Sequence, residues 1–208
     1  MFGEGALSFR EFVMREPLPL AMIHDAVLEF LRGRDDAVLF GAQAVNAYVE
    51  EPRMTQDVDI LSTRAKELAD EIKEHLSSRF HIAVRIRKAG GQGFRLFQVQ
   101  KSRNRHLVDV RPVLALPPAQ RFEEILVVEP AELIASKVIA FQRRRGTPKS
   151  GTDWRDLASL LLRFPELKCE SGPVADRLRV AGADNEALSA WTELVAEELL
   201  PEQEDDEF

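Results

Sequence analysis

The sequence predicts an α+β protein, in which a mixed or antiparallel sheet is flanked by helices and followed by a C-terminal helical region. Runs that alternate apolar and polar residues, the period of a strand, recur up to residue 113, whereas apolar residues beyond 117 follow helical spacing. Pro112, Pro117 and Pro118 separate the two halves. We therefore expect a core with an N-terminal helix over residues 1–116, a helical domain over 117–200 and an acidic disordered tail over 201–208.

The first half of the chain has clear start and stop signals for helices and strands. Apolar residues three and four apart follow Pro17 and Pro19 and stop at Gly33, which predicts a helix that packs on the sheet. Val38, Leu39 and Phe40 precede Gly41, as in a short buried strand that ends in a turn. The expected elements are a helix over 17–32, a strand over 37–40, a helix over 42–49, a strand over 57–61 and a helix over 63–78.

Three further strands and four helices are expected in the rest of the chain. The loop Ala89-Gly90-Gly91-Gln92-Gly93 predicts a hairpin turn, because it lacks the lysine and the spacing of a phosphate-binding P-loop. Gly146 and Pro148 end the first of the four helices, and Thr152 caps the second. The expected strands are 80–87, 94–100 and 106–113, and the expected helices are 129–145, 152–163, 173–181 and 184–200.

Composition predicts an ordinary globular protein. The chain has 208 residues, of which 45% are hydrophobic. No apolar run approaches the about 18 residues of a membrane span, and the first residues lack the basic and hydrophobic segments of a signal peptide. We therefore expect a cytoplasmic protein with no membrane partner. The single cysteine, Cys169, excludes a disulfide framework and a cysteine-rich structural zinc site.

The net charge of −7 hides an uneven distribution of charge. Residues 184–208 contain ten acids and no lysine or arginine, so the first 183 residues carry a net charge of +3. Within residues 79–112, nine lysines and arginines accompany one acid, Asp109. Such a basic stretch favours a phosphate or nucleic-acid partner. A solvated strand face is the alternative, although a face of that kind usually mixes both signs.

Asp57 and Asp59 are the strongest indication of chemistry in the sequence. Residues i and i+2 of a strand point to the same side, while Val58 and Ile60 point into the core. At a separation of about 5 Å and an effective dielectric constant of about 20, two carboxylates repel by about 3 kcal/mol, which a bound cation relieves. Mg²⁺ prefers such hard oxygen ligands. The alternative is the solvated polar face of an amphipathic strand.

Asp109 can supply a third carboxylate if its strand lies beside that of Asp57 and Asp59. Val108 and Val110 alternate around it, as expected for a buried strand. Three acids on one sheet face form the usual cage for two metal ions about 3.5–4 Å apart in phosphoryl or nucleotidyl transfer.

These elements resemble the signature of the DNA-polymerase-beta-like nucleotidyltransferase superfamily. That signature begins with a hydrophobic residue, followed by Gly and then by either Gly or Ser. A short helix comes next, then Asp-hydrophobic-Asp, and a single Asp further along the chain. Here it is matched by Phe40-Gly41-Ala42, Asp57-Val58-Asp59 and Asp109. The chain looks most like the branch of abortive-infection toxins of the AbiEii type, which also carries a lysine on a downstream helix and an Arg/Lys–Asp segment. The matching positions are Lys137, Arg143–Arg145 and Lys149–Asp156, and the resemblance covers residues 37–160.

The resemblance implies a nucleotidyltransferase fold and a role for each matching residue. Asp57 and Asp59 would hold two Mg²⁺ ions and Asp109 would complete the cage. Gly41 would let the backbone approach the triphosphate of an NTP. Lys137 would contact phosphate oxygens; a helix lysine whose stem lies on the surface is the alternative. Asp153 or Asp156 would position Lys137 or the acceptor.

The implied activity is Mg²⁺-dependent transfer of a nucleoside monophosphate from an NTP to an acceptor hydroxyl. RNA, in particular a tRNA end, is the expected acceptor, and a protein hydroxyl or a small molecule is the alternative. The resemblance also implies a toxin of a toxin–antitoxin or phage-defence system, with an antitoxin partner. Where the family prefers a second Gly or Ser, this chain has Ala42, and Gln43 is the nearest side chain that can donate a hydrogen bond instead. Ala42 supports a second hypothesis, a non-catalytic module that binds RNA or a partner protein.

Overall fold

The structure is a computed structural model that describes residues 18–90, 93–101 and 103–200. The chain divides into two compact units, which we describe separately. The first unit comprises Met1–Ala44 and Arg53–Val128, and the second comprises Val45–Pro52 and Glu129–Phe208. The acidic tail expected over 201–208 lies outside the described residues.

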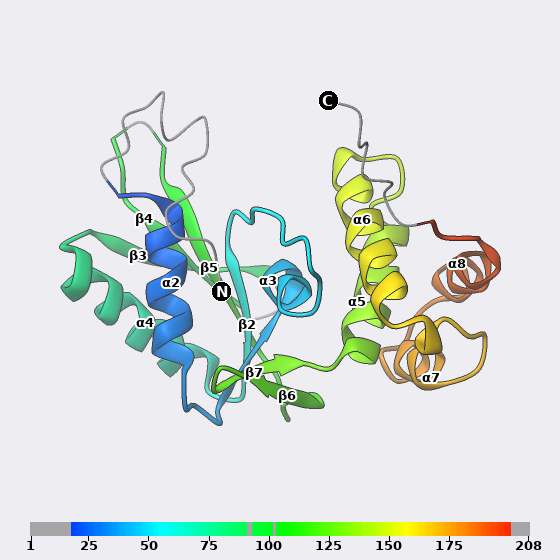
Figure 1. Cartoon of the computed structure of the whole chain (residues 1–208). Coiled ribbons are helices and arrows are strands. Elements are labelled where there is room, and N and C mark those ends of the chain that lie inside the picture. Colours follow the sequence, from blue (N-terminus) through cyan, green and yellow to red (C-terminus); the bar gives the residue numbers. More distant parts are fainter. Residues whose placement is uncertain (1–17, 91–92, 102, 201–208) are drawn as a thin grey trace. The chain divides into compact units, whose positions relative to one another are not determined.

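The first unit is built on a seven-stranded mixed sheet in the order β3-β4-β5-β2-β1-β7-β6 (Figure 1). The β2–β5 and β1–β7 pairs are parallel, and the other neighbouring strands are antiparallel. The α+β fold with a mixed sheet is therefore confirmed. The strands are β1 Ala37–Phe40, β2 Val58–Ser62, β3 Val84–Lys88, β4 Phe94–Gln98, β5 Arg105–Pro112, β6 Ala119–Phe122 and β7 Ile125–Val128.

Two helices cover one face of this sheet. Helix α2 (Leu20–Leu31) and helix α4 (Ala65–Phe80) pack against each other and against the strands. In β2, Val58 and Ile60 are fully buried, whereas Asp59 between them is partly exposed. The period of two therefore places the apolar residues in the core and leaves the opposite face of the sheet for the acids. The short helix α3 (Gly41–Asn46) follows β1 directly.

A group of ion pairs fixes β1 and β2 to α4 at one end. Arg34 bonds Asp36 and Glu71, each at 2.8 Å, and Arg64 bonds the same two acids at 3.0 and 3.2 Å. Both arginines donate to the same carboxylate oxygen, Oδ2 of Asp36. These ion pairs hold the start of β1 against the helix that follows β2.

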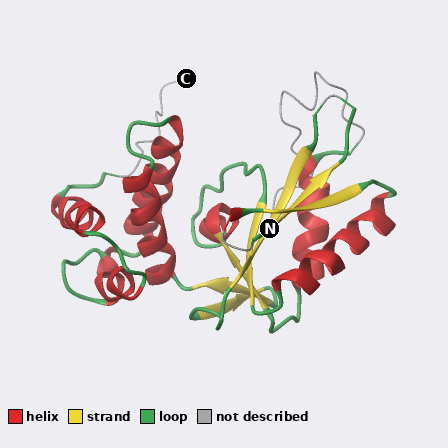
Figure 2. Cartoon of the chain, turned by 180° about the vertical axis from the view of Figure 1, so that it is seen from behind, coloured by secondary structure: helices red, strands yellow, loops and turns green. Residues whose placement is uncertain are grey.

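The second unit is helical, as expected (Figure 2). Helix α5 packs against α6, α7 and α8. Asp184 caps α8, because its carboxylate accepts the Ala187 N–H at 2.9 Å. The Lys168 ammonium donates to the carbonyls of Val195 and Glu197 at the other end of that helix. The elements are α5 Pro130–Arg143, α6 Pro148–Arg163, the 3₁₀ turn η2 Pro165–Leu167, α7 Pro173–Val180 and α8 Asn185–Ala196.

Three differences from the boundaries expected from the sequence go beyond a shift of a few residues at the end of an element. Strands β6 and β7 lie beyond the expected domain boundary, and the units divide after Val128, because β7 pairs with β1 and completes the sheet. Helix α4 continues to Phe80, where a strand was expected, and ends at His81 in a left-handed conformation. Helix α6 begins at Pro148 rather than after Thr152, since proline fits the first turn of a helix.

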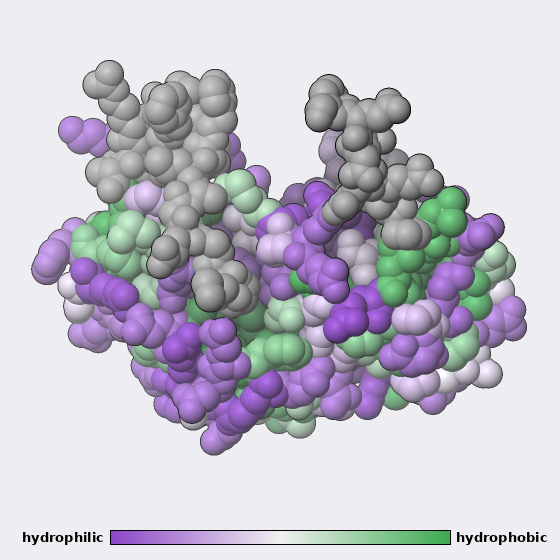
Figure 3. All heavy atoms as spheres, viewed as in Figure 1, coloured by the Kyte–Doolittle hydropathy of each residue, from purple (hydrophilic) through white to green (hydrophobic). Residues whose placement is uncertain are grey.

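The face seen in Figure 3 is mostly hydrophilic, with hydrophobic residues gathered in separate patches. Among the described helices, none has both the length and the apolar character that crossing a membrane requires.

Candidate active site

The structure brings Asp57, Asp59 and Asp109 together from two neighbouring strands. Asp59 lies on β2 and is paired in parallel register with Asp109 on β5. Residues opposite one another on adjacent strands point to the same face, so these two carboxylates are neighbours. Asp57 directly precedes β2, two residues before Asp59. Asp59 and Asp109 therefore lie side by side on neighbouring strands, with Asp57 at the start of one of them.

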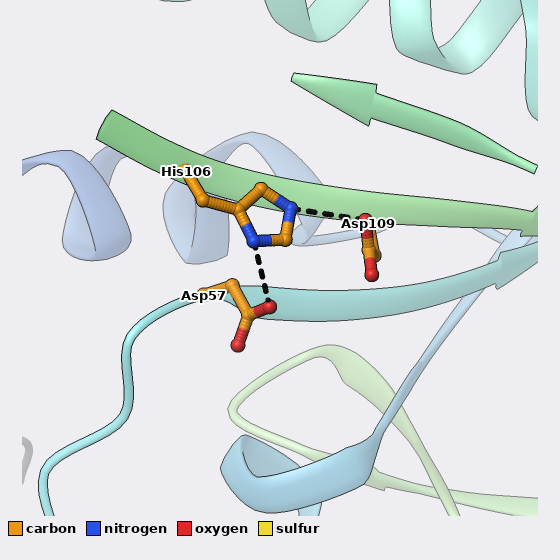
Figure 4. Close-up of side chains that lie close together, drawn as sticks. All are labelled: Asp57, His106 and Asp109. Atoms are coloured by element: carbon orange, nitrogen blue, oxygen red, sulfur yellow. Dashed lines mark hydrogen bonds and ion pairs between the residues drawn. The ribbon is translucent and has the colours of Figure 1, made fainter. Parts of the chain in front are cut away.

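His106, at the start of β5, joins two of these acids (Figure 4). Its Nδ1 lies 3.1 Å from Oδ2 of Asp57, and its Nε2 lies 3.0 Å from Oδ1 of Asp109. One ligand atom from each of the three residues lies within 4.8 Å of the others. Asp59 stands outside this group, although it is in register with Asp109.

His106 was missed in the sequence because it precedes Asp109 by three residues. In a regular strand, residues i and i+3 point to opposite faces. The register between β4 and β5 shifts between Leu96 and Phe97, so that Leu96 pairs with Val108 but Phe97 pairs with His106. This β-bulge turns His106 to the face of the acids.

Gly41 is the residue that makes room for Asp59. It has a φ of +71°, and a Cβ built on it would lie 2.2 Å from Oδ2 of Asp59. The hydrogen of glycine is therefore the only side chain that this position accommodates without moving the carboxylate. Gly41 therefore leaves room for the Asp59 carboxylate, in addition to the role in triphosphate binding that the resemblance implies.

Two arginines with half-exposed side chains bind the acids of the site. The Arg95 guanidinium donates to Oδ1 of Asp109 at 3.1 Å, and Arg111 donates to Oδ1 of Asp59 at 3.4 Å. Both arginine side chains are about half exposed, at 51% and 52%, whereas the Asp109 side chain is only 8% exposed. Cationic groups therefore surround the acid cluster and partly neutralise it.

Ala42 and Gln43 occupy the first turn of α3. Ala42 is partly exposed, while Gln43 is buried. The Gln43 amide donates to the Thr55 hydroxyl at 2.7 Å and lies 3.4 Å from Nδ1 of His24. The side-chain donor expected to replace a serine at position 42 is thus directed to the segment that leads to Asp57.

Lys137, Asp153 and Asp156 form a buried cluster in the second unit. The Lys137 ammonium on α5 bonds Oδ2 of Asp156 on α6 at 2.5 Å and lies 3.9 Å from Oδ1 of Asp153. Asp153 is held instead by Arg144, at 2.9 Å. The sequence left open which acid positions Lys137, and this geometry favours Asp156.

The comparison with known families decides what kind of protein carries this site. A sequence model of the family described as "Nucleotidyl transferase AbiEii toxin, Type IV TA system" matches residues 26–206. The chain belongs to the AbiEii nucleotidyltransferase toxin family. The resemblance stated from the sequence is thereby confirmed. No protein of curated function matches the chain significantly.

Solved structures support the fold of this AbiEii nucleotidyltransferase. The polyadenylate synthase of Megavirus is 12% identical, with a TM-score of 0.58, over 76% of this chain and 36% of that one. A putative nucleotidyltransferase from Helicobacter pylori is 15% identical, with a TM-score of 0.54, over 91% and 93% of the two chains. The JHP933 protein of H. pylori is 16% identical, with a TM-score of 0.52, over 92% and 91%. At these identities the likeness shows the fold alone.

The donors at the AbiEii site suit a divalent cation. Asp57 and Asp109 offer carboxylate oxygens and His106 offers an imidazole nitrogen, all within 4.8 Å of one another. Oxygen donors suit Mg²⁺, and adding imidazole also suits Mn²⁺ and other transition metals. The residues present therefore fit the metal that the family resemblance implies.

Without metal, His106 itself is expected to stabilise the acid cluster in a pH-dependent way. Burial opposes the charged imidazolium, but hydrogen bonds to Asp109 and Asp57 and the attraction of both carboxylates outweigh it and raise the pKa of His106 to about 9. A raised pKa stabilises the fold fully below the ordinary histidine value near 6.5 and ceases to do so as pH rises through about 9. We expect a loss on the order of 2–3 kcal/mol in the free energy of unfolding across that range.

Urea unfolding in EDTA at pH 6 to 9.5 measures this effect, with His106→Gln as the comparison. The variant lacks the titrating group, so its stability should change less over the same range. Parallel curves for the two proteins would show that His106 does not act in this way.

Proposed function

We propose that this AbiEii nucleotidyltransferase transfers a nucleoside monophosphate from an NTP to the hydroxyl of an acceptor, in a reaction that requires Mg²⁺. Two observations carry the proposal: Asp59 on β2 is paired in register with Asp109 on β5, and Asp57 and Asp109 lie close together around His106. The first unit is the catalytic core in this proposal, and the second is a helical domain that carries Lys137.

The reaction forms a bond from the acceptor oxygen to the α-phosphorus and breaks the bond from that phosphorus to the oxygen that bridges to the β-phosphate. Pyrophosphate leaves, and the hydroxyl proton passes to water. Bound Mg²⁺ ions would neutralise the charge that develops on the attacking and leaving oxygens. Catalysis of this kind depends mainly on positioning and on electrostatic stabilisation.

The residues of the chain have the following proposed roles. Asp57 and Asp59 hold the metal ions, and Asp109 completes the cage and orients the attacking hydroxyl. Gly41 keeps the Asp59 carboxylate in place and lets the backbone approach the triphosphate. Lys137, held by Asp156, binds phosphate oxygens.

RNA is the acceptor we favour, and a tRNA end is the first candidate. The support is the basic stretch over residues 79–112, in which Asp109 is the single acid. The family description also supports an antitoxin as a partner, since it places these enzymes in type IV toxin–antitoxin systems.

Incubation with labelled NTPs, Mg²⁺ and total RNA tests the proposal. The wild type should label RNA, and Asp59→Asn should reduce labelling by about 100-fold or more, because an amide binds metal poorly and no longer neutralises its charge. Asp70→Asn is the matched control, since Asp70 is exposed on α4. Equal labelling by wild type and Asp59→Asn, or labelling by neither, would contradict the proposal and favour a non-catalytic binding module.

A further inference from the structure

A line of charged side chains crosses four strands on the face of the acid cluster. Arg87 on β3 is paired with Arg95 on β4, Arg95 is paired with Asp109 on β5, and Asp109 is paired with Asp59 on β2. Paired residues share a face, so the two arginines extend the line of the two acids toward the edge strand β3 (Figure 1).

Other residues on these strands continue the same face. Arg85 is two residues from Arg87 and is paired with Phe97, and Arg111 is two residues from Asp109. The period of two points all of them to the side of the acids. Arg85, Arg87, Arg95 and Arg111 are all exposed. We call these four residues the arginine face.

Two of these arginines make cation–π contacts with aromatic rings. The guanidinium carbon of Arg87 lies 5.3 Å from the centre of the Phe97 ring, and that of Arg111 lies 4.9 Å from the centre of the Phe40 ring. The Phe97 ring also stacks on His106 at 5.0 Å. A planar guanidinium held over a ring is fixed in orientation, and unpaired RNA bases stack on such planes.

A hollow lies beside Asp109 on this part of the sheet. It has a volume of about 440 Å³ and is lined by Arg95, Asp109, Arg111 and the glycines Gly90 and Gly93, among others. This volume lies within the range of about 300–1,000 Å³ that is usual for small-molecule sites. Two arginines thus border a space that opens onto the proposed metal ligand.

We infer that the arginine face binds the single-stranded 3′ end of an RNA acceptor and leads its terminal hydroxyl to Asp109. Arginines at this face bind phosphates, and the guanidinium planes of Arg87 and Arg111 stack unpaired bases. The inference rests on the proposed function. It further implies that the NTP enters from the opposite side, where Gly41 contacts Asp59. An acidic peptide would bind the positive charges of the arginine face, but it has no bases to stack on the guanidinium planes of Arg87 and Arg111.

RNA binding without any NTP tests the inference separately from catalysis. The probe is a labelled RNA hairpin with a single-stranded 3′ overhang, and the dissociation constant is measured by fluorescence anisotropy over a range of salt concentrations. Arg85→Ala/Arg87→Ala should weaken binding about tenfold. It should flatten the slope of log affinity against log salt by about 1.4, because the charges of both arginines, including the stacked Arg87, neutralise phosphates of the single strand. Lys66→Ala/Lys73→Ala is the matched control, because it removes two exposed charges from α4 on the other face.

Arg87→Lys separates charge from stacking. It keeps the positive charge but loses the planar guanidinium, so it should weaken binding of the overhang about fivefold, because one base loses the plane on which it stacks. Binding of an abasic overhang should not change. If Lys66→Ala/Lys73→Ala and Arg85→Ala/Arg87→Ala weaken RNA binding equally, the inference is overturned.

Failure of the inference and failure of the proposed function give different results. If the wild type labels no acceptor but the strand variant still loses RNA affinity, the proposed function fails and RNA binding at the arginine face stands. If labelling persists while RNA affinity is unchanged in the variant, the inference alone fails. Labelling of a protein only, with unchanged RNA affinity, would indicate a protein acceptor.

Discussion

Gly41→Ala should lower nucleotidyl transfer by about 100-fold while leaving the protein folded. The new methyl group would lie 2.2 Å from Oδ2 of Asp59, so the carboxylate must move. A displacement of about 1 Å at a catalytic group reduces rates by about this factor. The positive φ also destabilises the fold by about 1–2 kcal/mol, because the left-handed region disfavours a Cβ. Transfer assays and circular dichroism measure the two effects.

Gly33→Ala is a close control for this prediction. Gly33 has a φ of +72°, almost the same as Gly41, but a Cβ there would meet nothing within 4 Å. It should therefore show the same loss of stability with normal activity. Equal activities of the two variants would mean that the contact with Asp59 has no catalytic consequence.

Asp156→Ala should destabilise the protein by about 3 kcal/mol, which corresponds to a fall in melting temperature of about 6–12 °C. The Asp156 side chain is 1% exposed and that of Lys137 is 10% exposed, so removing the carboxylate leaves a buried ammonium without its nearest partner. The loss lies at the low end for a buried pair because Asp153 remains 3.9 Å from the Lys137 ammonium. Thermal unfolding gives the measurement.

A double variant separates stability from catalysis at this pair. Lys137→Met/Asp156→Leu removes both charges and should regain most of the stability, whereas activity should stay low if Lys137 binds phosphate. Asp176→Ala breaks an exposed pair with Arg179 and should change stability by less than about 1 kcal/mol. A stable and fully active double variant would remove Lys137 from the proposed site.

The sequence predicted the centre of the sheet well because its signals are local. The alternation around Asp57 and Asp59 and the apolar residues beside Asp109 are read within a few residues. Strands β6 and β7 were not predicted: β6 has no clear pattern, whereas the apolar run Ile125-Leu126-Val127-Val128 of β7 is typical of a buried strand and was overlooked. Their place in the sheet depends on the pairing of β7 with β1, which no local pattern contains.

The partners of the acids could not be predicted for the same reason. Arg95 was visible as part of a basic stretch, but its bond to Asp109 depends on the register of β4 and β5. His106 depends on the shift in that register, which a regular strand pattern excludes. Likewise, the division of Asp153 and Asp156 between Arg144 and Lys137 is a matter of helix packing and cannot be read from spacing.

The parallel pairing of β2 with β5 has a consequence for how the protein folds. Asp59 and Asp109 become neighbours only after the intervening chain, with α4, β3 and β4, has closed into a loop. Closing a long loop costs entropy before its contacts form, so pairing of this kind is slow. The mutual repulsion of the carboxylates therefore arises in the same step that pairs the buried Val58 and Ile60 with Val108 and Val110.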